Sequence, residues 1–304
     1  MQTELGRARL STGEDLRLLG VEAPDAAWQG RLGALLGHKR APYLGQIQAA
    51  LAGPLGGLQT LFYVGAVAEE PVTCAVVAGA AGAGVFGHVY TVPAWRRRGA
   101  AAALHRALAA DLPARGYRCL TLGTNPEGHA RRIYEGIGFR QVTPGSGSML
   151  WGDGQPPPGA LAASAAEWAD WGWISAAGCA PPVPGEDRPR SRLLGPGGPG
   201  HVEGPFAAAL QEGRPLLALR QGGAAVGWAE FSPAAAAVLG AVALDFYVRP
   251  ECAAGTGVLF AALPWPERPV VCAARARGPV LQAAGFRAVA ELPAPLGTTL
   301  WLRA

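Results

Sequence analysis

Residues 88–104 read His-Val-Tyr-Thr-Val-Pro-Ala-Trp-Arg-Arg-Arg-Gly-Ala-Ala-Ala-Ala-Leu. The β-branched and aromatic run at the start ends at Pro93, and an alanine-rich segment with Leu104 and Leu108 at helical spacing follows an arginine-rich turn. This order predicts a strand, a turn and a helix. Because the first amides of a helix are free and lie at the positive end of its dipole, the turn predicts a phosphate or pyrophosphate site. Gly99 lets such a ligand approach the backbone closely.

Two spaced motifs give this stretch a family resemblance. Arg96-x-x-Gly99-x-Ala101 matches the signature Q/R-x-x-G-x-G/A, and thirty residues later the segment 130–139 matches A-x-x-L/I-Y-x-x-x-G-F. In this order the two motifs resemble the GNAT superfamily of N-acetyltransferases. The resemblance implies an α/β fold in which a mixed, mostly antiparallel sheet is flanked by helices. It also implies that the strand at 117–124 splays away from the strand at 88–92.

The resemblance further implies acetyl-CoA as cosubstrate and assigns residues to it. The backbone of Tyr90, Thr91 and Val92 would hold the pantetheine arm in the splayed slot, and Asn125 would contact the same arm. The pyrophosphate would lie on the turn, where backbone amides and guanidinium groups converge. The residues expected there are Arg96, Arg97, Arg98, Gly99, Ala100 and Ala101.

Tyr134 is the expected general acid. A phenol has a pKa of ~10, above the ~8.5 of a thiol, so its proton passes readily to a departing thiolate. The alternative is that the Tyr134 ring only packs into the core.

The general base stays open. His88 titrates near neutrality and lies two residues before Tyr90, on the same face of a regular strand; it is a candidate base, and a buried structural histidine is the alternative. Glu127 and His129 are competing candidates, and a chain of water molecules is another route.

Composition restricts the remaining classes. The net charge is +4, Lys39 is the only lysine, and five cysteines without close spacing favour reduced, buried thiols over a metal or redox site. The charge is too small and too dispersed for nucleic acid. No run reaches the ~20 apolar residues of a membrane span, and the first residues lack the apolar core of a signal peptide. We therefore expect a cytoplasmic protein that binds neither a metal, a nucleic acid nor a membrane.

The segment before the central stretch predicts helices and a hairpin. Leucines and alanines at helical spacing predict helices at 14–20, 26–36 and 44–52, and in the resemblance these helices cover the acceptor end of the cleft. Residues 82–87 fit the dinucleotide fingerprint G-x-G-x-x-G, but a strand follows where that fingerprint requires a helix. We interpret them as a glycine-rich hairpin.

The second half repeats the first. Residues 246–257 align with 90–101 at an offset of 156, and 280–287 align with 133–140 at an offset of 147. The sequence therefore predicts two tandem GNAT folds: a first domain at 1–151, a Pro- and Gly-rich linker at 152–159 and a second domain at 160–304, helical at 160–175.

The second copy differs where chemistry would occur. The three arginines of the first turn become Cys252, Ala253 and Ala254, and the tyrosine becomes Leu281. Gly255 and Gly257 still allow a close backbone approach, so we expect weak binding of acyl-CoA or none, and no catalysis.

The resulting prediction is an N-acetyltransferase that moves an acetyl group to a primary amine of a small molecule or peptide, with the chemistry in the first domain. A non-catalytic acyl-CoA-binding scaffold or sensor is the alternative. A hydroxyl or thiol acceptor and a longer acyl donor stay open. Two fused copies predict a monomer that is a pseudo-dimer of domains, or a homodimer.

Overall fold

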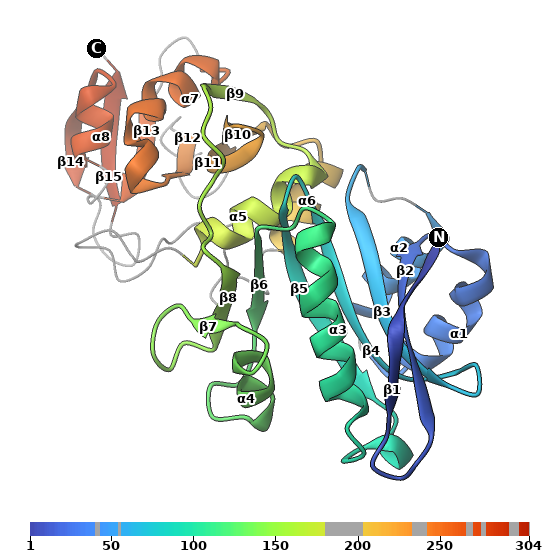
Figure 1. Cartoon of the computed structure of the whole chain (residues 1–304). Coiled ribbons are helices and arrows are strands. Elements are labelled where there is room, and N and C mark those ends of the chain that lie inside the picture. The colour runs from blue at the N-terminus through green and yellow to red at the C-terminus, as the bar shows by residue number, and fades with distance from the viewer. Residues whose placement is uncertain are drawn as a thin grey trace. The chain divides into compact units, whose positions relative to one another are not determined.

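The computed structural model describes residues 1–39, 43–53, 56–179, 203–232, 242–265, 270–274, 278–291 and 298–303. It divides into two compact units, each built on its own sheet (Figure 1). Within the described residues, the first unit contains 1–39, 43–53, 56–155 and 171–179, and the second unit contains the rest.

The first unit is an eight-stranded mixed sheet in the order β1-β2-β3-β4-β5-β6-β8-β7. All neighbouring strands are antiparallel except β5 and β6, which are parallel. This is the mixed, mostly antiparallel α/β sheet that the motifs predict. The strands are β1 (Gln2–Arg9), β2 (Asp15–Ala23), β3 (Gln59–Val67), β4 (Glu70–Ala80), β5 (Ala83–Thr91), β6 (Cys119–Gly123), β7 (Arg140–Gln141) and β8 (Ser148–Gly152).

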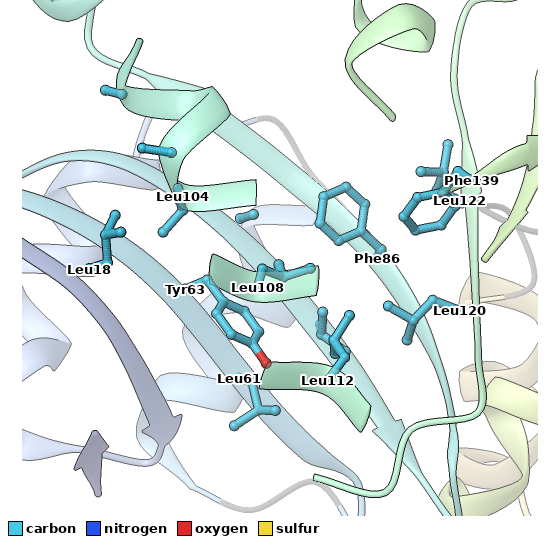
Figure 2. Packing of buried hydrophobic residues seen from close by; sticks show 14 of the residues in the cluster. Leu18, Leu61, Tyr63, Phe86, Leu104, Leu108, Leu112, Leu120, Leu122 and Phe139 are labelled. Atoms are coloured by element: carbon cyan, nitrogen blue, oxygen red, sulfur yellow. The ribbon is translucent and has the colours of Figure 1, made fainter. Parts of the chain in front are cut away.

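Helices cover both faces of this sheet. On one face α3 (Ala100–Ala114) inserts Leu104, Leu108 and Leu112 between β-strand side chains, and Figure 2 shows these leucines beside Tyr63 and Phe86. On the other face α1 (Ala26–Leu36) and α2 (Tyr43–Ala52) cover a second cluster that includes Trp28. The fourth helix, α4 (His129–Glu135), follows β6.

The predicted helices at 26–36 and 44–52 are confirmed, but the helix predicted at 14–20 is wrong, because these residues lie in β2. Leu16 and Leu18 pack under α3, whereas Leu19 and Val21 pack under α1. A strand with helices on both faces buries successive residues, so its leucines lose the alternation that marks a strand.

The glycine-rich segment 82–87 forms a hairpin and the start of β5, as expected. Ala81 and Gly82 have φ values of +51° and +84° and make the turn between β4 and β5. A strand follows them, so the segment is not a dinucleotide-binding turn.

Strand β5 separates from β6 partway along its length. Among the described residues, the parallel pairing covers only Ala83–Val85, against Cys119–Thr121, and the ladder with β6 stops before Phe86. On the other side a bulge shifts the register with β4, so that His88 and Val89 together oppose a single residue. Half of β5 therefore borders an opening in the sheet.

A short helix from beyond the linker completes the first unit. The helix α5 (Trp171–Ala177) is buried throughout and contacts β4, β5 and β6. Trp173 donates a hydrogen bond of 2.9 Å from its ring nitrogen to the carbonyl of Ala81. The predicted boundaries place these residues in the second domain, and the structure groups them with the first unit. The helix predicted at 160–175 is wrong at its start, where β9 (Leu161–Ala165) is a strand.

The second unit repeats the topology of the first. Its seven strands run in the order β14-β15-β13-β12-β11-β10-β9, which corresponds strand by strand to β7-β8-β6-β5-β4-β3-β2. Again a single neighbouring pair, β12 and β13, is parallel. The further strands are β10 (Leu216–Gln221), β11 (Ala224–Ser232), β12 (Val242–Val248), β13 (Val270–Ala274), β14 (Phe286–Glu291) and β15 (Thr298–Arg303), and the helices are α6 (Glu203–Gln211), α7 (Thr256–Ala262) and α8 (Gly278–Ala283).

Candidate active site

The turn between β5 and α3 leaves a row of amides without partners. The first backbone bond of the helix runs from the amide of Ala103 to the carbonyl of Gly99, and no side chain caps the helix. Within the described part of the chain, the amides of residues 97–102 donate no hydrogen bond. Arg97 and Gly99 have φ values of +61° and +90°, which curves the backbone into a concave surface of amides. A Cβ placed on Gly99 would meet no atom within 4 Å, so the surface is open.

The three arginines of the turn have three different surroundings. Arg98 pairs with Glu14 at 3.1 Å and lies over the ring of Trp95 at 4.8 Å, so it joins the turn to the β1–β2 hairpin. Arg96 donates a 3.0 Å hydrogen bond to the carbonyl of Thr91. Arg97 is exposed and has no ion pair among the described residues. Of the three guanidinium groups, that of Arg98 is therefore held by a carboxylate, whereas Arg96 and Arg97 are exposed and have no ion pair among the described residues.

The residues predicted to hold the pantetheine arm lie on the separated half of β5. Tyr90 packs toward α1 and α2, and the ring of His38 lies against it, tilted by 33°, at a centroid distance of 4.0 Å. The carbonyl of Tyr90 and the hydroxyl of Thr91 both bond to the hydroxyl of Thr73 on β4, at 3.0 and 2.8 Å. The amide of Val92 bonds back to β4 as well. The strand is thus fixed on its β4 side, and its other side borders the opening.

Tyr134 packs beside β5, at the point where its pairing with β6 stops. Its ring packs edge-on against Phe86 at a centroid distance of 5.5 Å and also contacts Phe139 and His105. The amide of Phe139 bonds to the carbonyl of Tyr134, and Gly138, in the turn after the helix, has a φ of +97°; this turn fixes the position of the ring. Burial raises the pKa of Tyr134, so its phenol stays protonated at neutral pH. In the described part of the chain its hydroxyl has no hydrogen-bond partner.

His88 lies at the bulge of β5 with a φ of +51°. The bulge interrupts the alternation of the strand, so the expectation that His88 and Tyr90 share a face by a period of two does not apply here. Burial first, and the nearby Lys39 second, lower the pKa of His88 to about 4. The imidazole is therefore neutral and weakly basic at physiological pH.

The other candidates lie at the start of α4. The side-chain oxygen of Asn125 accepts a 3.0 Å hydrogen bond from the amide of Glu127, so it shapes the turn into the helix. Asn125, Glu127 and His129 are all exposed. The amide nitrogen of Asn125 has no hydrogen bond among the described residues and could contact a ligand.

Sequence reasoning missed His105, which lies inside α3. The residue is 1% exposed, and neither ring nitrogen has a hydrogen-bond partner in the described structure. Its ring lies 5.8 Å from Phe86 and 6.1 Å from Tyr134, and burial lowers its pKa to about 4. The signal in the sequence was its spacing: His105 follows Leu104 and precedes Leu108 on the buried side of an amphipathic helix.

The corresponding turn of the second unit is closed. Gly255 has a φ of −77° and is buried, and a Cβ placed on it would lie 2.7 Å from a methyl group of Leu219. The hydroxyl of Thr256 bonds to the carbonyl of Ala253, and the thiol of Cys252 bonds to Gln221. The expectation that Gly255 allows a close approach is wrong, because this glycine makes room for a leucine of the core. Gly257 remains open, with no atom within 4 Å of a Cβ.

The described residues contain neither a cluster of metal-binding side chains nor a helix that could span a membrane. No group of three or more His, Cys, Asp or Glu side chains there could hold a metal ion. In the same part of the chain, no helix combines the length and the apolar character needed to cross a membrane.

Comparison with known proteins gives one family match. Residues 63–145, which run from β3 past α4, match the family of FR47-like proteins. No curated protein matches the chain.

Solved structures with a similar fold are GNAT proteins. The GNAT domain of S. lividans PAT is 15% identical and aligns over 48% of this chain and 93% of its own, with a TM-score of 0.38. The GNAT N-acetyltransferase YhbS from Escherichia coli, solved with CoA, is 14% identical over 45% of this chain and 81% of its own, with a TM-score of 0.36. The ribosomal-protein-S18-alanine N-acetyltransferase from Escherichia coli is 17% identical over 43% and 90%, with a TM-score of 0.34.

The family match covers three features of the first unit: the separated β5 and β6, the open turn at Gly99 and the helix that carries Tyr134. The first unit thus has the mixed α/β fold that the motifs predict, and residues 63–145 within it match the family of FR47-like proteins.

Proposed function

We propose that this protein is an acetyl-CoA-dependent N-acetyltransferase whose chemistry takes place in the first unit. The observation that carries the proposal is the open concave surface of amides at residues 97–102, which lies at the end of the separated half of β5. An anion-binding turn and an unpaired strand edge together suit a long ligand with phosphates at one end and amide groups along its length.

The residues of the turn fit the pyrophosphate of acetyl-CoA. The amides of residues 97–102 would donate to its oxygens, and the exposed guanidinium of Arg97 would add a charge-assisted bond. The backbone of residues 90–92 would pair with the pantetheine arm in place of a strand. When bound, acetyl-CoA supplies the acetyl group as a thioester.

Tyr134 would deliver the proton that the leaving group needs. The amine of the acceptor attacks the thioester carbonyl, the carbon–sulfur bond breaks, and the Tyr134 hydroxyl gives its proton to the sulfur. Two observations support this role: the hydroxyl has no partner in the described structure, and burial keeps the phenol protonated. A phenol with a raised pKa is a weak acid in water, but a thiolate in a low-dielectric site is a strong enough base to take its proton.

The acceptor is proposed to be a primary amine of a small molecule or a peptide, since an amine must lose a proton to become the amide product. His88, neutral at pH 7 and placed at the bulge, is the proposed base. As the carbon–nitrogen bond forms, His88 would accept the proton that the amine loses and pass it to solvent, and the Tyr134 phenolate would regain a proton from solvent.

The second unit is proposed to bind no acyl-CoA and to catalyse nothing. Its turn has a buried glycine in place of an open one, and it lacks the arginines. Two units of matching topology in one chain are proposed to form a tandem pair of GNAT folds, as a monomer or a homodimer.

Calorimetric titration of acetyl-CoA into the full chain tests the proposal, with Gly99→Leu and Gly257→Leu as matched variants. Both glycines have open space around a Cβ, but only Gly99 lies on the amide surface. We expect one site in the wild type and in Gly257→Leu, and none in Gly99→Leu. Unchanged binding in Gly99→Leu would overturn the site. If acetyl-CoA binds but no tested amine causes the release of free thiol from it, the result would favour the non-catalytic scaffold.

A further inference from the structure

The loop after α1 holds a lysine against the face of β5 that α1 and α2 cover. The amide of Lys39 bonds to the carbonyl of Leu36 at 2.9 Å, and a ring nitrogen of His38 lies 3.1 Å from the carbonyl of Leu35. The contact of the His38 ring with the Tyr90 ring, at a centroid distance of 4.0 Å, fixes this loop to the separated half of β5. Lys39 is therefore held beside the strand that borders the opening.

Two electrostatic effects show which groups the Lys39 ammonium faces. It adds to the burial that lowers the pKa of His88, at the bulge of β5. It also opposes the burial that raises the pKa of the Cys74 thiol, on the neighbouring strand β4, to about 12. The ammonium therefore acts on the middle of the sheet next to the bulge.

The surroundings of Lys39 supply positive charge and no counter-ion. Across the described residues, no carboxylate forms an ion pair with Lys39. A second cation lies near Tyr90: the guanidinium of Arg96 is 5.9 Å from the centre of the Tyr90 ring. A half-buried ammonium without a counter-ion, beside another cation, creates a potential that attracts an anion.

The phosphates of acetyl-CoA, bound at the turn, would lie too far from Lys39 to be that anion. Lys39 acts at His88, whereas the amide surface begins at Arg97, on the far side of the end of β5. At ~3.3 Å per residue, the strand from His88 to Val92 alone spans about 13 Å. A cosubstrate with its pyrophosphate on the turn would bring its thioester, and not its phosphates, toward the bulge.

From this placement we infer that the acceptor amine carries an anionic group, of the carboxylate class, that binds to Lys39 while the amine faces the bulge of β5. The inference rests on the proposed function and specifies its substrate class. His38 and Tyr90 would form the flat side of this subsite, and Lys39 would decide which amines are bound productively.

The test compares pairs of amines that differ in the anion alone. The pairs are 4-aminobutyrate with 4-aminobutanamide, β-alanine with β-alaninamide, and, as a phosphate arm, phosphoethanolamine with ethanolamine. Turnover is followed by the release of free thiol, and the same compounds are titrated calorimetrically into the full chain saturated with CoA. The variants are Lys39→Met and Lys39→Arg, with Arg31→Met as a control, since Arg31 lies on α1 over the ring of Trp28.

We expect the carboxylate member of a pair to have a kcat/KM at least tenfold above that of its amide. Lys39→Met should remove this preference mainly through KM, Lys39→Arg should restore part of it, and Arg31→Met should leave it unchanged. The affinity for acetyl-CoA should be the same in all of these proteins. A preference for the phosphate arm alone would contradict the carboxylate class.

Three results would overturn the inference: equal use of both members of each pair, no Lys39-dependent binding of any anionic amine to the CoA-saturated chain, or a loss of acetyl-CoA affinity in Lys39→Met. The last result would place Lys39 in the cosubstrate site. Failure of the proposed function has a separate signature, because the wild-type chain would then bind no acetyl-CoA.

Discussion

The Arg98 guanidinium lies 3.1 Å from the carboxylate of Glu14, and its neighbour Arg97 has no such pair among the described residues. The amide of Ser11 also bonds to the carbonyl of Arg98, so Arg98 fastens the turn to the β1–β2 hairpin. Two adjacent arginines of one motif thus differ: Arg98 holds the turn in place, and Arg97 is exposed to solvent.

This difference predicts opposite phenotypes for two matched substitutions. Arg97→Gln should weaken acetyl-CoA binding about tenfold, the effect of one lost charge-assisted bond, and leave the melting temperature unchanged. Arg98→Gln should lower the melting temperature by a few degrees and weaken binding only as far as the turn loosens. Calorimetric titration and thermal unfolding of both variants provide the comparison. Equal losses of affinity at unchanged stability would show that both guanidinium groups bind the anion.

Tyr134→Phe separates chemistry from packing. The variant keeps the ring that packs 5.5 Å from Phe86 and loses a hydroxyl that has no partner in the described structure. We expect turnover to fall about 100-fold or more, with acetyl-CoA affinity and the free energy of unfolding nearly unchanged. Tyr63→Phe is the control, since its hydroxyl bonds to Asp111 at 2.8 Å, so that variant should lose stability and keep turnover. Wild-type turnover in Tyr134→Phe would remove the general acid from the mechanism.

Much of the fold was predictable from local sequence patterns. The strand, turn and helix at 88–104 are specified by a β-branched run, a glycine with positive φ and an alanine-rich segment, and all three features act locally. The segment 14–20 was not predictable in this way, since its leucines are divided between two cores on opposite faces of β2.

The sequence predicted which residues lie in the candidate site, but not what each of them contacts there. The sequence placed three arginines on one turn. The carboxylate of Glu14, which forms an ion pair with Arg98, comes from a hairpin 84 residues earlier in the chain. The bulge at His88 and the burial of Gly255 also depend on contacts with distant strands. Periodicity contains no information on such contacts.

His105 predicts a loss of stability in acid. Its pKa of about 4 in the folded protein lies below the ~6.5 of an unfolded chain, so the unfolded state binds more protons between these values. Stability therefore falls as the pH drops from 6.5 to 4, by up to about 3 kcal/mol from this residue, and levels off below. His88, with the same lowered pKa, adds a second contribution in this window.

Chemical unfolding of His105→Leu at pH 7 and pH 4.5 measures this effect. The variant should lose roughly half of the acid sensitivity and keep or gain stability at pH 7, because the substitution removes two buried ring nitrogens without partners. The exposed His129→Gln is the control and should follow the wild type. An unchanged pH dependence in His105→Leu would show that this imidazole becomes charged without unfolding the protein.

The packing of α5 on the first unit predicts that a residue beyond the linker controls the stability of that unit. A Cβ placed on Gly172 would lie 2.3 Å from the carbonyl oxygen of Ala83, so Gly172→Ala must push the helix away from β5. Overpacking of this kind costs about 1–3 kcal/mol.

The matched control is Gly33→Ala in α1, where a Cβ meets no atom within 4 Å and alanine favours the helix by about 1 kcal/mol. In thermal unfolding of the full chain, we expect the midpoint of the first unit's transition to fall by several degrees for Gly172→Ala and to rise slightly for Gly33→Ala. Acetyl-CoA should shift the transition that Gly172→Ala lowers, because the amide surface and α5 belong to the same unit. If the ligand-sensitive transition is unaffected by Gly172→Ala, α5 does not stabilise the first unit, and the boundary between the units lies at the linker, before α5.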